Sequence, residues 1–295
     1  MHKPEILPAI AERALARRGG VRVFDRLDPA RTAHIVVDLQ NGFMAAGAVC
    51  EIGNAREIVS NVNRISAVLR KAGGLVVYLQ HTCDEEAVRS WPVFFEHFCS
   101  PERRDRMIAA FTPGASGHEV WDGLDVQPRD LKVRKRRFGA FAPGSSELHA
   151  ILQERGIDTL IITGTASNVC CESTARDAMM LNYKVFFIED GNATHTDDEH
   201  NATSLQHGSA GAERGPVRRG EAGGLNGLNS LHTRCHHACP MTLDFAARAQ
   251  SRGWPACAGH DGSGQAPTSG TRPCPRSGGR RCGRLLPPGR ASSGA

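Results

Sequence analysis

Five short runs of apolar and β-branched residues recur between Ala33 and Asp190, and longer segments with helical periodicity separate them. The runs are residues 34–39, 75–80, 130–134, 159–163 and 184–189. Most are nearly unbroken apolar stretches, which is typical of strands that helices cover on both faces. The alternation therefore predicts an α/β fold built on a mainly parallel sheet.

The intervening segments complete this prediction. Apolar residues recur at spacings of four, three and four over residues 58–69, and a glycine pair ends that segment. Residues 145–155 and 170–182 predict two further helices. Residues 84–128 are less regular, and their clustered aromatic residues fit either a surface helix packed on the core or a substrate lid. The expected architecture is a Rossmann-like three-layer sandwich, with the sheet flanked by helices.

The pattern stops near residue 203. Residues 204–295 hold 17 of the 32 glycines and 12 arginines but no lysine. We therefore predict an N-terminal extension (1–30), a catalytic domain (31–203) and a low-complexity basic tail (204–295), either disordered or the product of a shifted reading frame. A tail that binds nucleic acid or membrane is the rival interpretation. Because aromatic residues are nearly absent there, we expect no nucleic-acid partner.

Other classes of protein are disfavoured. The chain has neither an apolar run long enough to span a membrane nor a secretory leader pattern, which predicts a cytoplasmic protein without a membrane partner. Cysteine and histidine residues near 235–260 fit no standard zinc finger. The five cysteines before the tail lack the spacing of a disulfide framework and are interpreted as reduced thiols, namely Cys50, Cys83, Cys99, Cys170 and Cys171.

The sharpest feature is the run ITGTASNVCCESTARDA, residues 162–178, in which an apolar strand meets a glycine-containing turn and a helix is expected to open at Cys170. Ligands bind beyond the carboxyl ends of parallel strands, and a residue that starts a helix meets the positive end of its dipole. We therefore expect a lowered pKa for the Cys170 thiol and nucleophilic reactivity. Cys171 is the alternative nucleophile, but it points about 100° away on a helix.

Two charged residues fall at the same predicted edge. Asp38 follows the first strand and Lys135 follows the third. A carboxylate beside a thiol can accept its proton, and an ammonium can stabilise the thiolate. Backbone N–H groups of the turn before Cys170 could hold the oxyanion formed during attack. No Gly-x-Gly-x-x-Gly follows the first strand, which disfavours a nucleotide-binding domain.

The motifs resemble those of the isochorismatase-like cysteine hydrolase superfamily over residues 32 to about 203. The Asp-x-Gln motif of that family stands here as Asp38-Leu39-Gln40, and its lysine stands as Lys135 in KRRFGAF. The nucleophile motif Gly-x-x-Thr-x-x-Cys aligns with the segment from Gly164 to Cys170, although Ser167 replaces the usual threonine. The local sequence NVCCESTARDA is most similar to the ureidoacrylate and N-carbamoyl amidase branches.

This resemblance implies a mechanism and a set of site residues. Asp38 would be the base, Lys135 its electrostatic partner and Cys170 the nucleophile that forms an acyl-thioester. A cis peptide bond between Thr165 and Ala166 would direct the N–H groups of Ala166 and Cys170 at the oxyanion. The expected activity is hydrolysis of a C–N bond, other than a peptide bond, in a small amide, ureido or N-carbamoyl compound, without a cofactor.

Several expectations accompany this assignment. Nicotinamidases of the family hold a metal through Asp-x-His after the second strand, whereas residues 81–84 here read HTCD, so we predict no metal. Arg136, Arg137 and His34 are available to bind a substrate carboxylate, although the substrate-binding residues stay unknown. The resemblance also implies a homodimer or homotetramer. The alternative is an inactive or unstable family member, because the tail replaces the last helix and strand of the fold.

Overall fold

The computed structural model describes residues 2–3, 12–13, 15–17, 24 and 26–208, all within one compact unit of the chain. The predicted tail lies almost wholly outside these residues, as does much of the predicted N-terminal extension, so both stay predictions. The last described helix, α9 (Asp197–Gly208), continues across the predicted domain boundary at residue 203. None of the described helices has the length and apolar character needed to cross a membrane.

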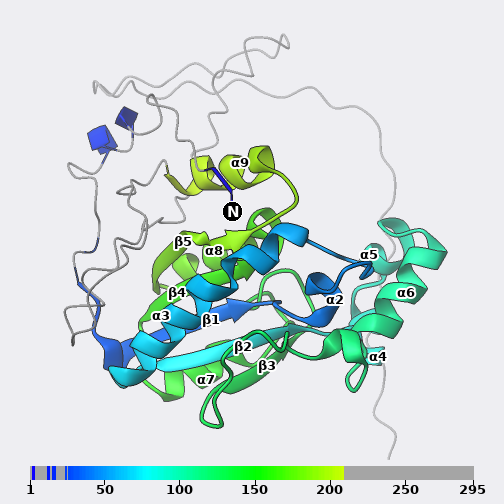
Figure 1. The fold of residues 1–295 in the computed structure, drawn as a ribbon, viewed down its shortest axis with the longest axis horizontal. Helices are drawn as coiled ribbons and strands as arrows, with labels where there is room; N and C mark the ends of the chain where they lie inside the picture. Colours follow the sequence, from blue (N-terminus) through cyan, green and yellow to red (C-terminus); the bar gives the residue numbers. More distant parts are fainter. Residues whose placement is uncertain (1, 4–11, 14, 18–23, 25, 209–295) are drawn as a thin grey trace, which may run out of the picture. The chain divides into compact units, whose positions relative to one another are not determined.

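Five strands form where the apolar runs predict them (Figure 1). They are β1 (Thr32–Val37), β2 (Leu75–His81), β3 (Leu131–Lys135), β4 (Thr159–Thr165) and β5 (Lys184–Ala193). The helices are α2 (Asn41–Met44), α3 (Val59–Lys71), α4 (Glu85–Ser90), α5 (Pro92–His97), α6 (Pro101–Phe111), α7 (Leu148–Glu154) and α8 (Glu172–Met180). Short turns are η1 (Pro29–Arg31), η2 (Gly53–Ile58), η3 (Ser116–His118) and η4 (Ser167–Cys171).

The strands pair in the order β3-β2-β1-β4-β5, and every pair is parallel. At the carboxyl end of the central strand, Val37 pairs with Leu79 on one side and with Gly164 on the other. Because all strands run in the same direction, their carboxyl ends share one edge of the sheet. Loops from distant parts of the sequence therefore meet there.

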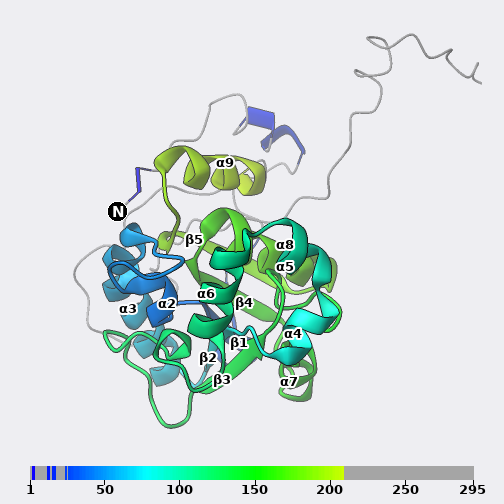
Figure 2. The same ribbon diagram turned by 90° about the vertical axis from the view of Figure 1, so that its right-hand side faces the viewer.

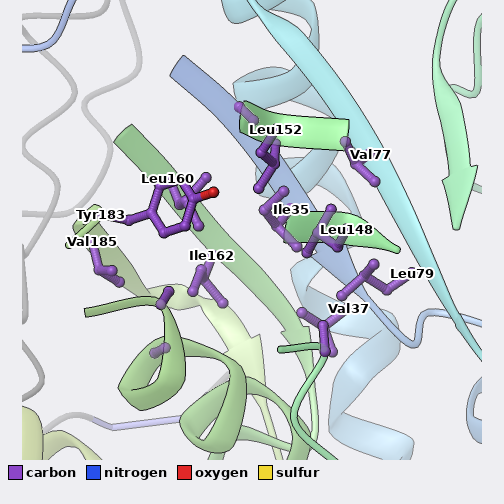
Figure 3. Close-up of a cluster of buried hydrophobic side chains, with 14 of the residues drawn as sticks. Ile35, Val37, Val77, Leu79, Leu148, Leu152, Leu160, Ile162, Tyr183 and Val185 are labelled. Atoms are coloured by element: carbon purple, nitrogen blue, oxygen red, sulfur yellow. The ribbon is translucent and has the colours of Figure 1, made fainter. Parts of the chain in front are cut away.

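Helices cover both faces of the sheet, which confirms the predicted three-layer architecture (Figure 1 and Figure 2). On one face, Leu148 and Leu152 of α7 pack against Ile35 and Val37 of β1 (Figure 3). On the other face, the stripe predicted over residues 58–69 is buried on α3, where Val62, Ile65 and Leu69 have no exposed surface. Burial of each such side chain contributes about 1.5–3 kcal/mol, so this stripe fixes α3 on the sheet.

The irregular segment 84–128 forms three short helices, α4, α5 and α6, which lie together at the right of Figure 1. Phe95 and Phe111 are buried in the core, with 3% and 0% of their surface exposed. Phe98 directly follows α5 and is 75% exposed. The segment thus anchors part of its aromatic set in the core and leaves part of it at the surface.

Candidate active site

Asp38 lies at the carboxyl edge of the sheet, directly after β1, as the sequence predicts. Its φ angle is 53°, in the left-handed region that aspartate adopts more readily than most residues. The chain turns sharply here, since the N–H of Gln40 donates to the Asp38 carbonyl at 2.8 Å. The carboxylate is fully buried, so any charge on it requires a nearby partner.

Lys135 supplies that partner from two strands away. It is the last residue of β3, and β2 separates β3 from β1. Its Nζ lies 2.7 Å from Asp38 Oδ2, and both side chains are fully buried. Nζ also donates to the Arg137 carbonyl at 3.1 Å. A buried pair of this kind is stable only while each charge compensates the other.

Cys170 lies in η4, a π-helical turn between β4 and α8. The helical turn begins at Ser167, three residues earlier than the sequence predicts. The peptide bond between Thr165 and Ala166 is cis, as the family resemblance implies. The N–H groups of Val169 and Cys171 both donate to the Ala166 carbonyl at 3.1 Å. These bonds fix the turn that carries the thiol.

Gly164 allows β4 to approach β1 at the level of the site. Its φ angle is 127°, a conformation that residues with a side chain rarely adopt. A Cβ atom at this position would lie 2.1 Å from the Val37 carbonyl oxygen. The first residue of the nucleophile motif therefore has a steric role, because any larger residue would push the Cys170 turn away from Asp38.

The Cys170 thiol interacts with both members of the buried pair, so the structure brings the three predicted residues together. Burial raises the pKa of Cys170 to about 12; the Lys135 charge opposes this shift and the Asp38 charge adds to it. Burial also raises the pKa of Asp38, against the opposing charge of Lys135. For Lys135, burial favours the neutral amine, but Asp38 and Cys170 outweigh it and raise its pKa.

The sequence predicts the opposite shift for the Cys170 pKa, from the positive end of a helix dipole. The structure differs because only 5% of the Cys170 surface is exposed, and removal of water from a thiolate outweighs a partial dipole charge. The thiol is therefore protonated at neutral pH. Its reactivity requires a base in contact with it, rather than a thiolate that exists beforehand.

Gln40 links the carboxyl ends of β1 and β2 through hydrogen bonds. Its Nε2 donates to the carbonyl of His81 at 3.1 Å and to that of His118 at 2.9 Å. The N–H of His81 donates to Gln40 Oε1 at 2.7 Å. The sequence motif contained Gln40 but gave it no role, because its partners are backbone groups of β2 and η3, which are distant in sequence.

A second network holds the Cys170 turn from the side of β5 and α9. Ser167 Oγ lies 2.8 Å from His200 Nδ1, and both residues are fully buried. Thr194 Oγ1 donates to Asn168 Oδ1 at 2.8 Å. The serine that replaces the usual family threonine thus uses its hydroxyl to fix the loop.

A cavity of about 540 Å³ opens above Cys170. Cys170 and Ala166 line it, whereas Cys171 is fully buried in the core and is absent from the lining. The cavity is also lined by Phe43, Ala48, Val49, Cys50, Glu51, Ile52, His81, Phe94, Phe98, Cys99, Arg103, Met107, Phe138, Val169 and His195. Phe94 and Phe98 belong to the inserted segment, which packs on the core and also lines the cavity. Its role as a substrate lid stays a prediction.

The His81 ring also lines this cavity, and burial and the Lys135 charge hold its pKa well below the usual value. Its Nδ1 has no hydrogen-bond partner among the described residues. His81 thus presents a neutral imidazole in the cavity.

The place where related enzymes hold a metal does not fit one here. The Asp84 carboxylate accepts bidentate hydrogen bonds from the Arg136 guanidinium at 2.7–3.0 Å. It also caps α4 by accepting from the N–H of Ala87. Burial raises the pKa of Cys83 to about 12, which disfavours the thiolate that a metal requires. Within the described ranges, no group of three histidine, cysteine or carboxylate side chains could hold an ion. We therefore derive no step through a metal.

The residues suggested for binding a substrate carboxylate lie elsewhere. His34 is fully buried between Ser66 Oγ and Thr163 Oγ1, at 2.9 and 2.8 Å, and burial lowers its pKa to about 3. Arg136 is paired with Asp84, and the Arg137 guanidinium donates to the Ser90 carbonyl at 2.9 Å. None of these three lines the cavity. Arg103 does line the cavity. No pattern in the sequence indicated this.

Known proteins resemble this chain in sequence and in fold. The model of the isochorismatase domain family matches residues 32–213. The chain is 34% identical over 184 residues to the ureidoacrylate amidohydrolase RutB of Caulobacter vibrioides, covering 57% of this chain and 79% of RutB. It is also 34% identical over 184 residues to a probable inactive nicotinamidase of Arabidopsis thaliana, covering 62% of this chain and 90% of that protein. A cysteine hydrolase structure from Pseudomonas syringae superposes with a TM-score of 0.52 at 26% identity, covering 62% and 86%.

Proposed function

The chain belongs to the isochorismatase family, and from this premise we propose that it hydrolyses the C–N bond of a small amide, ureido or N-carbamoyl compound through an acyl-thioester on Cys170. It is a hydrolase that acts on carbon–nitrogen bonds other than peptide bonds. One observation carries the proposed mechanism: the Cys170 thiol lies at the cavity and interacts with the buried ion pair of Asp38 and Lys135.

The first half of the reaction forms the acyl-enzyme. The Asp38 carboxylate accepts the thiol proton while Cys170 Sγ attacks the carbonyl carbon, because the protonated thiol is a weak nucleophile. Lys135 stabilises the negative charge as it moves from carboxylate to sulfur. The N–H groups of Ala166 and Cys170 receive the oxyanion. Collapse of the tetrahedral adduct returns the proton to the leaving nitrogen and breaks the C–N bond.

The second half releases the product. Water enters the site vacated by the leaving amine, and Asp38 takes its proton as the oxygen attacks the thioester carbonyl. The adduct expels Cys170, which recovers its proton, and the acid or carbamate departs. The neutral His81 ring at the cavity supports this scheme, since its Nδ1 is available to a substrate amide without a charge to be neutralised.

The proposal is tested by assaying ammonia release from a panel of carbamoyl, ureido and carboxamide substrates. We expect turnover by the full chain and loss of at least about 10³-fold in kcat for Cys170→Ala, as for removal of a nucleophile. Cys171→Ala is the matched control, because this neighbouring thiol is buried away from the cavity. Normal turnover by Cys170→Ala, or its loss only in Cys171→Ala, contradicts the assignment.

A family member without activity is the second candidate, and one observation favours it. In the described part of the sheet β5 is an edge strand, and the family model matches the chain only as far as residue 213. A folded but inactive protein would show a cooperative melt and no ammonia release from any substrate of the panel. The homodimer or homotetramer and the cytoplasmic location stay predictions; light scattering of the full chain tests the former.

A further inference from the structure

The cavity above Cys170 is larger than a small polar amide, which is the smallest substrate that the proposed reaction needs. Its volume of about 540 Å³ falls in the range of pockets that enclose drug-sized ligands. A carboxamide group with its nearest atoms occupies only the base, beside Cys170 and His81. The remaining space is available to another part of the substrate, and its lining indicates the chemistry that this part would need.

Aromatic side chains form one wall of this space, and they pack against one another. Phe94 packs against Trp91 with ring centroids 4.4 Å apart and meets the edge of Phe138 at 5.4 Å. Trp91 itself contacts Phe138 at 4.9 Å. The two cavity-lining rings, Phe94 and Phe138, are thus held in place without a ligand. Phe98 extends the wall to the mouth, where 75% of its surface is exposed.

Charge at the mouth is provided by Arg103, in the first turn of α6. Among the described residues, its guanidinium makes one weak contact, from Nη2 to Cys50 Sγ at 3.9 Å, and no carboxylate pairs with it. Glu51, the one carboxylate among the described lining residues, is already paired with Arg56 at 2.9 Å. The charge left uncompensated in the described lining is therefore positive.

We propose that the substrate is an amide, ureido or N-carbamoyl derivative of an acid with an aromatic or branched aliphatic body. Its carboxylate binds Arg103, and its apolar body packs against Phe94, Phe98 and Phe138. This inference rests on the proposed function, which it narrows to a substrate class. Arg103 touches the end of the substrate that does not react, so it determines specificity and acts on KM more than on kcat.

Three compounds separate the two recognition elements. Racemic N-carbamoylphenylalanine has both the carboxylate and the apolar body, phenethylurea lacks the carboxylate, and N-carbamoylglycine lacks the body. We expect kcat/KM for the first to exceed that for each of the others by at least about tenfold, because a charge-assisted hydrogen bond and a buried aromatic group each contribute on that order. Equal values for all three compounds overturn the inference.

Two substitutions assign the effect. Arg103→Met should lower the ratio of kcat/KM for N-carbamoylphenylalanine over phenethylurea by about fivefold to twentyfold, the range for such a bond at a partly exposed position. Arg104→Met is the matched control: it removes the same charge from the same helix, but Arg104 pairs with Asp105 and lies outside the cavity lining. It should leave the ratio unchanged. An unchanged ratio in Arg103→Met overturns the inference.

A binding measurement separates this inference from the proposed function. In a Cys170→Ala background, calorimetry compares the affinity for N-carbamoylphenylalanine with and without Arg103→Met. We expect an affinity loss of the same size as the loss in the kinetic ratio. Absence of ammonia release from every substrate would remove the proposed function, yet Arg103-dependent binding would still support the substrate class. No Arg103-dependent binding, with turnover intact, would remove the substrate class alone.

Discussion

Replacement of Lys135 by methionine tests the buried ion pair on which the site depends. Methionine keeps an unbranched side chain of similar length but removes the ammonium that lies 2.7 Å from Asp38 Oδ2. Removal of one partner of a buried pair costs about 3–5 kcal/mol of unfolding free energy. Because both side chains are fully buried, solvent cannot screen the charge that is left.

The same magnitude follows from proton uptake. Without Lys135, burial is the dominant influence on Asp38 and raises its pKa further, so the variant folds with a neutral carboxyl. Protonation at pH 7 of a group whose unfolded pKa is about 3.9 costs about 4 kcal/mol. The folded variant then binds more protons than the unfolded chain. The stability of the variant should therefore fall as the pH rises above about 4, by up to about 1.4 kcal/mol per pH unit. The deficit relative to wild type should open at the higher pH where wild-type Asp38 ionises, because burial raises the pKa of that carboxyl as well.

Urea denaturation followed by circular dichroism, from pH 4.5 to pH 8, measures this deficit. Lys132→Met is the matched control, because Lys132 lies exposed on the same strand and should change stability by less than about 0.5 kcal/mol. The double variant Lys135→Met/Asp38→Asn removes both charges and should recover at least about 2 kcal/mol. A deficit below about 1 kcal/mol at pH 7, or one that does not vary with pH, would refute the reasoning.

Two further predictions concern buried residues of β4 and β1. Gly164→Ala would place a Cβ 2.1 Å from the Val37 carbonyl oxygen, so we expect loss of more than about 3 kcal/mol of stability together with loss of activity; a wild-type melting temperature would contradict this. Burial lowers the pKa of His34 to about 3, so its contribution to stability is present above pH 6.5 and is lost as the pH falls toward 3, by up to about 1.4 kcal/mol per unit. His34→Gln should flatten the dependence of unfolding free energy on pH in this interval, and an unchanged slope would exclude His34 as its source.

The sequence located the strands well because a parallel sheet covered on both faces leaves a strong local signal. All five apolar runs became strands, and the largest difference is at β5, which extends to Ala193 beyond the predicted residue 189. The extension contains Asp190, Gly191 and Asn192, whose polarity gives no strand signal. Asn192 is accommodated because its Nδ2 donates to the carbonyls of Ile162 and Ile188 at 3.0 and 2.6 Å.

The sequence could not determine the electrostatics of the site or the chemistry of the cavity. The pKa of Cys170 was predicted in the wrong direction, because a helix start is visible in sequence, whereas burial of the thiol by the rest of the fold is not. From the sequence, His34 and Arg136 were both candidates to bind a substrate carboxylate. In the fold, both are hydrogen-bonded to other side chains of the chain instead. Arg103 lies in a segment whose path over the site depends on the burial of Phe95 and Phe111.

The order of residues along the chain determined which side chains could react: a carboxylate and an ammonium at the ends of two strands, and a thiol in the turn that follows a third strand of the same parallel sheet. Those positions depend on periodicity and local backbone preference, which short stretches of sequence encode. Only the tertiary structure decided how the three groups perturb one another and what surrounds them. Desolvation and charge interactions depend on distances between residues that are remote in sequence, and only the assembled fold sets those distances.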